Sequence, residues 1–232
     1  MDVRGKVVVV TGASRGLGRA VAERWAAEGA RVALVARGEE VVEVASALRE
    51  RGLDAAAFRA DVGDVEQVDR LVAQVHERLG PVEVLVHAAG TLGPVPMPML
   101  LDAEPGDLRE ALATNVVGPF HLVRRLAGPM VLRGRGLVVC VSSDAAVERY
   151  PRWGVYAAGK AAMDLLVGTF AAELEGTGVR FVSVDPGEMD TVMHAMAVPD
   201  ADPASLRRPD DVAAALIAGL GRELPSRLVV EV

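Results

Sequence analysis

Short, mostly apolar runs rich in valine alternate along this chain with longer stretches in which apolar residues recur every three or four positions. Runs of six or seven residues without polar alternation are typical of strands that are buried on both faces of a sheet. Seven such runs predict strands at 6–11, 31–36, 55–60, 82–88, 136–142, 179–185 and 227–232.

The segments between these runs have the length and period of helices, for example 19–29 and 65–80. Repeated alternation of strand and helix predicts an α/β fold, a doubly wound, Rossmann-like parallel sheet of about seven strands with helices on both faces. The crossovers between parallel strands should be right-handed. No flexible linker, charge block or internal repeat interrupts the pattern, so residues 1–232 are predicted to form a single domain.

Two segments, 91–107 and 190–210, lack a regular pattern and contain four and three prolines respectively. Each directly follows a predicted strand and should lie at the carboxyl edge of the sheet, where ligands bind in this architecture. We expect them to enclose a substrate, with simple connections as the alternative.

Composition narrows the possible functions. A formal charge of −7 argues against a nucleic-acid partner, which would normally require a basic face. The single cysteine, Cys140, excludes an internal disulfide, is expected to be buried and inert, and fits a reducing compartment. No apolar run is long enough for a signal peptide or a membrane span, and no Cys/His cluster has metal-ligand spacing. The expectation is a cytoplasmic protein without a metal or a membrane partner.

A glycine-rich turn, TGASRGLG at 11–18, leads from the first predicted strand into a helix. Its spacing, Gly12-x-x-x-Gly16-x-Gly18, differs from the G-x-G-x-x-G fingerprint but has the same physical ingredients. Glycines permit a tight turn and close approach of a pyrophosphate, and a helix N-terminus attracts the anion. The turn, including Ser14 and Leu17, is therefore predicted to bind a dinucleotide.

The end of the second predicted strand indicates which dinucleotide. A ribose 2′-hydroxyl favours an acidic residue there, whereas a 2′-phosphate favours arginine. The chain has Arg37 at this point and Arg15 in the glycine turn, so NADP(H) is favoured over NAD(H), although Arg37 as a solvated surface residue is the alternative. Further cofactor contacts are expected after the third and fourth strands, at Asp61 and Val62 and at Ala88, Ala89 and Gly90.

One of only two tyrosines, Tyr156, stands four residues before one of only two lysines, Lys160. On a helix these side chains share one face. A free tyrosine has a pKa of about 10, and a nearby ammonium together with an oxidised nicotinamide should favour the phenolate. Tyr156 could then exchange a proton with a substrate oxygen.

The chain resembles the classical short-chain dehydrogenases/reductases over essentially its whole length. The matching motifs are TGASRGLG (11–18), AAG (88–90), Asn115 in TNVVG, Ser143 after the fifth strand, YAAGK (156–160) and DPGEMDT (185–191).

This resemblance implies an NADP(H)-dependent oxidoreductase that transfers hydride between the nicotinamide and a carbonyl or secondary alcohol. Tyr156 would be the general acid/base, Ser143 would orient the substrate oxygen, and Lys160 would also hold the nicotinamide ribose. Asn115 would support a water chain. Thr191, after the Pro186-Gly187 turn, would hold the nicotinamide amide. The nearby Ser142, His121 and His194 are given no catalytic role.

The resemblance has one departure, because His87-Ala88 replaces the family's usual Asn-Asn and puts the usual bracing hydrogen bonds in doubt. The substrate is expected at an apolar mouth formed by Tyr150, Trp153, Met189, Met193 and Met196. Family members commonly form homotetramers or homodimers through the helix here predicted at about 155–175.

Three rival functions were weighed. A sugar-nucleotide epimerase would need a further substrate domain, for which the residues beyond Asp211 leave no room. A structural subunit that binds no nucleotide conflicts with the glycine turn. A non-catalytic NADP(H)-sensing or partner-binding protein on the same fold remains open as the alternative.

Overall fold

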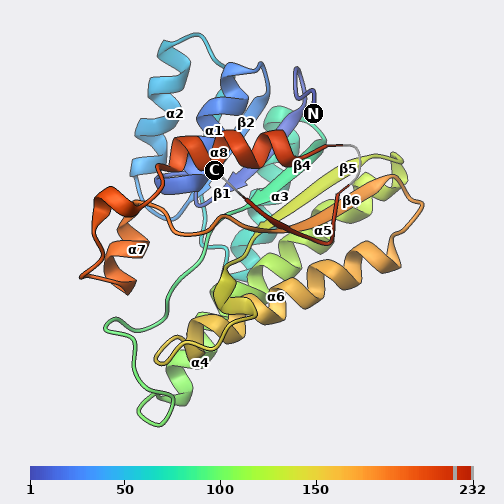
Figure 1. Ribbon diagram of the computed structural model, residues 1–232. Helices are drawn as coiled ribbons and strands as arrows, with labels where there is room; N and C mark the ends of the chain where they lie inside the picture. Colours follow the sequence, from blue (N-terminus) through green and yellow to red (C-terminus); the bar gives the residue numbers. More distant parts are fainter. Residues whose placement is uncertain (222–223, 231–232) are drawn as a thin grey trace.

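Figure 1 shows the computed structural model of the protein, which describes residues 1–221 and 224–230. Within this part of the chain, seven parallel strands form one sheet in the order β3-β2-β1-β4-β5-β6-β7. The predicted doubly wound sheet is therefore confirmed. The strands are β1 (Val7–Thr11), β2 (Arg31–Ala36), β3 (Ala55–Arg59), β4 (Val82–His87), β5 (Gly136–Val141), β6 (Val179–Asp185) and β7 (Arg227–Val229).

Successive side chains of each strand point to opposite faces of the sheet, so apolar side chains lie on both faces. Helices cover both faces (Figure 1). In β1, Val8 and Val10 pack with α1, α2 and α8, whereas Val7 and Val9 pack with α3, α5 and α6. The two apolar layers are separate, as valine-rich strands buried on both faces require. The helices are α1 (Gly16–Ala27), α2 (Glu40–Glu50), α3 (Val65–Leu79), α4 (Pro105–Leu112), α5 (Gly118–Leu132), α6 (Gly154–Glu173), α7 (Val192–Ala197) and α8 (Pro209–Gly219).

The boundaries of two elements differ from the predicted ones. Helix α1 begins at Gly16, inside the glycine turn, rather than at residue 19. The last predicted strand, 227–232, ends at Val229, and residues 231–232 lie outside the described residues.

The two proline-containing segments include helical parts. Segment 190–210 contains α7, which the Thr191 side chain caps, and α8 begins with Pro209. Segment 91–107 ends in α4, which starts at Pro105. Proline suits the first turn of a helix because its fixed φ is already helical. The N–H that proline lacks would also have no hydrogen-bond partner within the helix at this position. Helices therefore begin or lie within both segments, and the role of these segments in enclosing a substrate stays a prediction.

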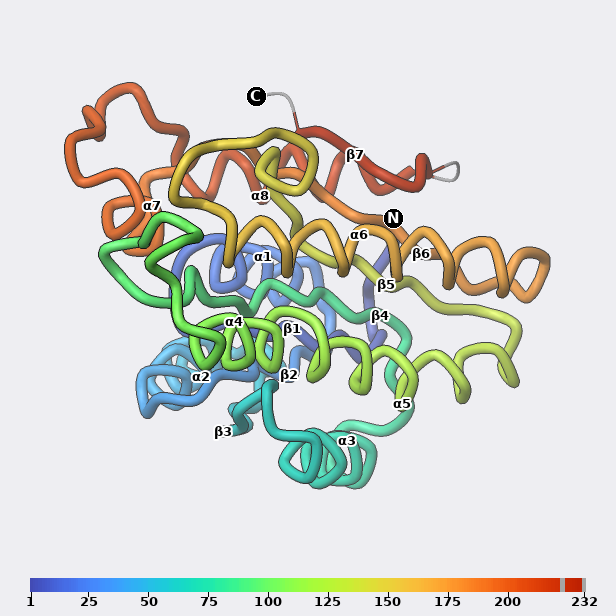
Figure 2. The backbone as a smooth tube through the Cα atoms, turned by 90° about the horizontal axis from the view of Figure 1, so that it is seen from below, coloured from blue at the N-terminus to red at the C-terminus, as the bar shows by residue number. Residues whose placement is uncertain are grey.

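The strand order reverses between β1 and β4, because β2 and β3 lie on one side of β1 while β4 to β7 lie on the other. In an open parallel sheet this reversal leaves a crevice outside the carboxyl ends of the strands. The glycine turn, the segment after β4 and the segment after β6 all leave the sheet at this edge (Figure 2). In the described residues, no helix has the length and apolar character needed to cross a membrane.

The core on the α5 face supplies a stability test with an internal control. Leu122 is 0% exposed on α5, whereas Leu132 at the end of the same helix is 89% exposed. Leu122→Ala should lower the free energy of unfolding by about 2–5 kcal/mol, since it removes buried apolar surface and leaves a cavity. Leu132→Ala should change it by no more than about 0.5 kcal/mol. Urea unfolding followed by circular dichroism measures both, and equal losses would contradict the assignment of Leu122 to the core.

Candidate functional site

Tyr156 and Lys160 lie on the buried face of α6, with 7% and 8% of their surfaces exposed. The Lys160 Nζ donates a 2.7 Å hydrogen bond to the Val141 carbonyl at the end of β5 and lies 5.6 Å from the centroid of the Tyr156 ring. Ser143 lies two residues after the end of β5, and its side chain is close enough to the Tyr156 phenol to act on its pKa. The three residues that sequence selected are therefore together at the carboxyl edge of the sheet.

The pKa of the Tyr156 phenol is set mainly by burial and by nearby carboxylates. Burial raises the pKa of Tyr156 to about 12, and the Ser143 hydrogen bond opposes that shift. The carboxylates of Asp144, Asp185 and Asp164 raise the pKa further. Among the chain's own groups, lost solvation and carboxylate charge dominate the pKa of this phenol. That the ammonium together with an oxidised nicotinamide favours the phenolate stays a prediction. Burial also lowers the pKa of Lys160, to about 8.

Asp144 is a neighbour of Ser143 that sequence reasoning missed. The Ser143 Oγ donates to its Oδ1 at 2.9 Å, and the Tyr150 hydroxyl donates to its Oδ2 at 2.8 Å. A hydroxyl has only one hydrogen, so Ser143 can donate to either Asp144 or another acceptor at one time. The only sequence signal for Asp144 was its position next to Ser143.

Asn115 lies in a π-helical turn, Ala113–Val117, that joins α4 to α5. Its amide nitrogen donates to the Thr91 carbonyl at 2.8 Å, and its Oδ1 accepts from the Thr91 N–H at 2.9 Å. A Cβ on Gly159 would lie 2.9 Å from the Asn115 Cβ, so glycine lets α6 approach closely. Asn115 thus fixes the segment after β4 beside α6, and its role in a water chain stays a prediction.

The glycine turn forms a narrow cradle. Gly12 has a φ of +70°, and a Cβ there would lie 2.8 Å from the main chain of Ala88 and Ala89. A Cβ on Gly18 would lie 2.5 Å from the Gly12 carbonyl oxygen. Leu17 is buried beneath the turn. The structure therefore places the predicted phosphate-binding turn directly against the predicted ribose-binding segment.

Gly90 joins this cradle to the buried lysine. A Cβ at Gly90 would lie 3.3 Å from the Asn115 Oδ1 and 3.7 Å from the Lys160 Nζ. Glycine therefore leaves the approach to the ammonium open. On the other side of the cradle, the Thr191 Cγ2 lies 3.4 Å from a Cβ placed on Gly16, which brings the segment after β6 beside the glycine turn.

The turn after β6 is held by its own residues. Gly187 has a φ of +67°, and its N–H donates to the Asp185 carboxylate at 3.0 Å. The Pro186 carbonyl accepts a 2.8 Å hydrogen bond from Arg207. Thr191 caps α7, where its hydroxyl accepts from the His194 N–H at 3.1 Å.

The cationic end of the site lies at the ends of β2 and β3. An Nη1 of Arg37 lies 3.7 Å from a carboxylate oxygen of Asp61, and the Arg37 side chain is largely exposed. Arg15 is also exposed, at the N-cap of α1. Val62, next to Asp61, is buried, so its side chain is part of the core and only its main chain lies at the carboxyl edge of the sheet.

His87 provides the brace that the missing asparagines put in doubt. The Thr11 hydroxyl accepts a 3.2 Å hydrogen bond from the Ala89 N–H and lies 2.9 Å from the His87 Nδ1. The Thr11 hydroxyl hydrogen is therefore free to be donated to Nδ1, which leaves the imidazole proton on Nε2. The link joins β1 to β4 at the reversal of strand order. Burial, with a smaller contribution from the Lys160 charge, lowers the pKa of His87 to about 3.

The expected apolar mouth is present in part. Trp153 meets the rings of Tyr150 and Tyr156 edge-on, at centroid distances of 6.2 and 5.7 Å. Met193 and Met196 are exposed on α7. Met189 instead packs against the core layer that contains α1 and α8, because its main chain pairs with Arg207. Met189 is only partly buried, so its place at the mouth stays a prediction.

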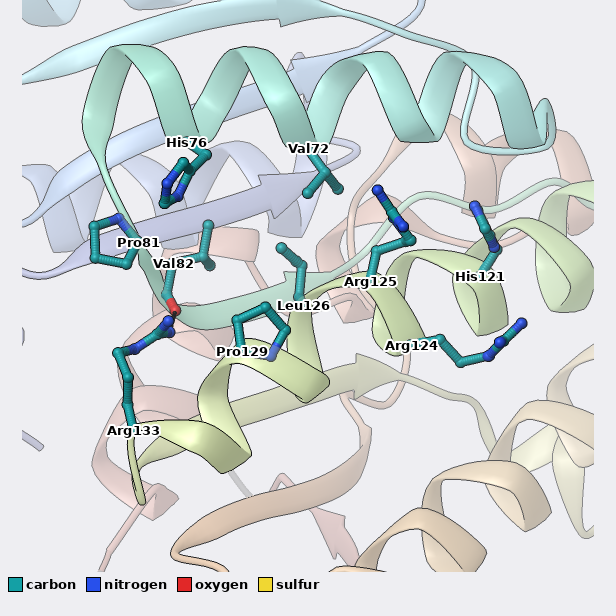
Figure 3. Close-up of a pocket in the computed structure, with 10 residues that line it drawn as sticks. All are labelled: Val72, His76, Pro81, Val82, His121, Arg124, Arg125, Leu126, Pro129 and Arg133. Carbon is teal, nitrogen blue, oxygen red and sulfur yellow. Dashed lines mark hydrogen bonds between the residues drawn. The ribbon is translucent and has the colours of Figure 1, made fainter.

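Two cavities lie away from the cradle. One, of about 530 Å³, separates α3 from α5, and Figure 3 shows the residues that line it. Its cationic side chains already have partners: Asp69 pairs with His121 and Arg125, and Arg133 donates to the Val82 carbonyl. The second, of about 440 Å³, borders α6 and the start of β7. None of the site residues predicted from sequence lines either cavity.

Comparison with known proteins identifies the family. The profile described as short chain dehydrogenase matches residues 6–202. A 3beta-hydroxysteroid dehydrogenase 1 from Eggerthella lenta is 34% identical over 92% of this chain and 86% of that protein. Glycine betaine reductase ATRR from Emericella nidulans is 35% identical over 93% of this chain, which spans only 18% of that protein's length.

The fold comparison agrees. The structure of a short chain dehydrogenase from Shigella flexneri, complexed with NADP, has a TM-score of 0.89 and 28% identity, with 98% of each chain covered. The chain therefore belongs to the short chain dehydrogenase family.

The buried His87 predicts a difference in acid stability. Its pKa of about 3 lies below the unfolded value of 6.5, so between these values the unfolded chain binds the extra proton. Within that window, protonation of His87 in the unfolded chain should lower the free energy of unfolding by about 1.4 kcal/mol for each unit by which the pH falls. Unfolding free energies of the wild type and His87→Asn, measured by urea denaturation between pH 6 and pH 4.5, should diverge accordingly. Parallel curves would contradict a buried, neutral imidazole.

Proposed function

We propose that this protein is an NADP(H)-dependent oxidoreductase that interconverts a carbonyl compound and a secondary alcohol, with Tyr156 as general acid/base. The observation that carries the proposal is that the buried Tyr156 and Lys160 lie with the half-buried Ser143 beside the glycine cradle. The side chains of Tyr156 and Lys160 are almost fully buried, so their polar ends are withdrawn from bulk water and act in a low dielectric.

The residues present fit a dinucleotide. Gly12 and Gly18 keep the turn free of side chains that would collide with neighbouring main chain, and Gly90 leaves the Lys160 ammonium accessible. We assign the diphosphate to the turn with Ser14, Arg15 and Gly16, the adenosine end to Arg37, Asp61 and Val62, and the nicotinamide end to Pro186, Gly187 and Thr191. Ala88, Ala89, Tyr156 and Lys160 would contact the ribose. The bound cofactor would supply or accept the hydride.

The chain's own residues would transfer the proton and orient the substrate oxygen that receives it. In reduction, Tyr156 Oη gives its proton to the substrate oxygen while the Ser143 hydroxyl orients that oxygen. The high pKa of Tyr156 keeps the phenol protonated at neutral pH and ready for this role. In oxidation the phenolate is needed, so the rate in that direction should rise with pH. The Lys160 ammonium one helical turn away stabilises the phenolate when it forms.

Arg37 supports NADP(H) over NAD(H). It is cationic, largely exposed and held by a single ion pair of 3.7 Å, so it can turn toward a phosphate at low cost. No acidic residue stands at position 36 to repel a 2′-phosphate. The NADP complex of the Shigella flexneri relative lends further support.

We also propose that copies of the chain associate as a homotetramer or homodimer through α6. The supporting observation is that this helix leaves the large apolar side chain of Leu165 exposed.

Tyr156→Phe is the test of the mechanism. The variant removes one hydroxyl from a buried ring and should retain NADPH binding while kcat falls by about 10²- to 10⁴-fold, the usual contribution of a general acid. NADPH absorbance, followed with a panel of ketones, aldehydes and alcohols, measures turnover, and NADPH fluorescence measures binding. Tyr150→Phe, which removes the other phenol at the expected substrate mouth, is the comparison, and it should change KM for the substrate rather than abolish kcat. Unchanged turnover in Tyr156→Phe would overturn the mechanism, and binding without turnover in the wild type would favour a sensing role.

Arg37→Gln is the test of cofactor preference. Loss of one charge-assisted hydrogen bond to the 2′-phosphate should raise the Kd for NADPH by about 10- to 100-fold and leave that for NADH nearly unchanged. Arg70→Gln is the control, because Arg70 is similarly exposed and its ion pair with Glu66 is also 3.7 Å long. Equal effects on both nucleotides, or a wild-type preference for NADH, would contradict the assignment.

A further inference from the structure

Arg227, the first residue of β7, donates to three segments at the carboxyl edge. Its Nη2 lies 2.9 Å from both the Ser143 carbonyl oxygen and the Asp185 Oδ2. Its Nε lies 3.2 Å from the Asp164 Oδ2. The Arg227 side chain is only 25% exposed, and those of both aspartates are less so.

Each partner belongs to a segment that carries a proposed functional group. The Ser143 carbonyl is part of the same residue as the hydroxyl beside Tyr156. Asp185 accepts from the Gly187 N–H and thereby shapes the turn that precedes Thr191. Asp164 stands four residues after Lys160 on α6 and accepts a second hydrogen bond from Ser183 on β6. One rigid guanidinium therefore joins the serine loop, the turn after β6 and the helix that bears the Tyr-Lys pair.

The network also sets local charge. Burial disfavours the charged guanidinium, but hydrogen bonds and attraction from Asp185, then Asp164, outweigh it and raise the pKa of Arg227. The same two carboxylates act on Tyr156 and raise the pKa of its phenol. A cation between them offsets part of that effect.

We propose that Arg227 is a positioning residue for the reaction. Its guanidinium sets the Ser143 main chain, the 185–187 turn and α6 relative to one another, and it neutralises the two carboxylates whose charge reaches Tyr156. This role rests on the proposed oxidoreductase function. The charged and polar groups around the phenol are Ser143 and Asp144 on the serine loop, Lys160 and Asp164 on α6, and Asp185 at the end of β6.

The first measurement needs neither substrate nor cofactor. Tyr150 and Tyr156 are the only tyrosines, so a Tyr150→Phe protein labelled with 3-fluorotyrosine gives one ¹⁹F signal, from position 156. The electron-withdrawing fluorine also lowers the pKa of the phenol into a milder range. Arg227→Gln should move the titration midpoint of this signal upward by roughly one pH unit, since two carboxylates lose their counter-ion. Arg227→Lys, which keeps the charge, should leave the midpoint close to that of the parent protein.

The second measurement is turnover. Arg227→Gln should lower kcat by about 10- to 100-fold, the scale of a misplacement of about 1 Å, with the Kd for NADPH changed by less than about threefold. Arg227→Lys should recover only part of kcat, because an ammonium lacks the planar fork that reaches three acceptors. Guanidinium chloride at low concentration should partly rescue Arg227→Ala, with sodium chloride at equal ionic strength as the reference.

Arg31→Gln is the matched control. Arg31 likewise joins a carboxylate and a carbonyl, those of Asp54 at 3.0 Å and Leu79 at 2.8 Å, but it stands at the first residue of β2, at the opposite edge of the sheet. A midpoint and kcat in Arg227→Gln that match those of Arg31→Gln would overturn the proposal. If Arg227→Gln is unstable, Arg227→Lys tests the proposal instead. A full kcat in Arg227→Lys would show that the planar guanidinium is not needed to position the site. Absence of turnover in the wild type would refute the proposed function alone, since the ¹⁹F titration still tests Arg227.

Discussion

Every functional feature of this protein depends on the parallel pairing of its strands. Because the paired strands run in one direction, their carboxyl ends meet at one edge, and the order reverses there between β1 and β4. Thr11, His87 and Asp185 end strands at this edge, and Ser143 follows β5 by two residues. Residues far apart in the chain are thereby brought within hydrogen-bond reach of one another. The backbone hydrogen bonds of the sheet hold that edge in place.

The second constraint is the burial of ionisable groups. Lys160 keeps its ammonium in the interior because it donates to the Val141 carbonyl and because Gly90 leaves it space. Tyr156 is surrounded by apolar rings and carboxylates, so its own environment favours the neutral phenol. A proton donor that stays protonated until a substrate oxygen is present is suited to reduction. The phenolate would depend on positive charge nearby, which the Lys160 ammonium and a bound oxidised nicotinamide would supply.

Two hydrogen-bond networks support this site from outside it. The Thr11–His87 link joins β1 to β4 with an imidazole and a hydroxyl in place of the family's usual amides. The Arg227 network joins the last strand to the serine loop, the turn after β6 and α6. Both networks use side-chain hydrogen bonds to hold together segments that are distant in the sequence, and both lie behind the proposed catalytic residues.

Sequence alone determined the sheet, its parallel character, the glycine cradle and the grouping of Ser143, Tyr156 and Lys160. The sheet and the cradle follow from local patterns, since apolar runs and helical periods indicate which faces are buried. Tyr156 and Lys160 share a face by helical geometry, whereas Ser143 was grouped with them through the resemblance to a known family. Tertiary structure alone decided the contacts of His87, Asp144 and Arg227, the packing of Met189 against the core and the direction of the Tyr156 pKa shift. Each of these depends on atoms distant in sequence, whose separation no local pattern encodes. An isolated arginine near the end of a chain carries no signal until folding places three acceptors around it.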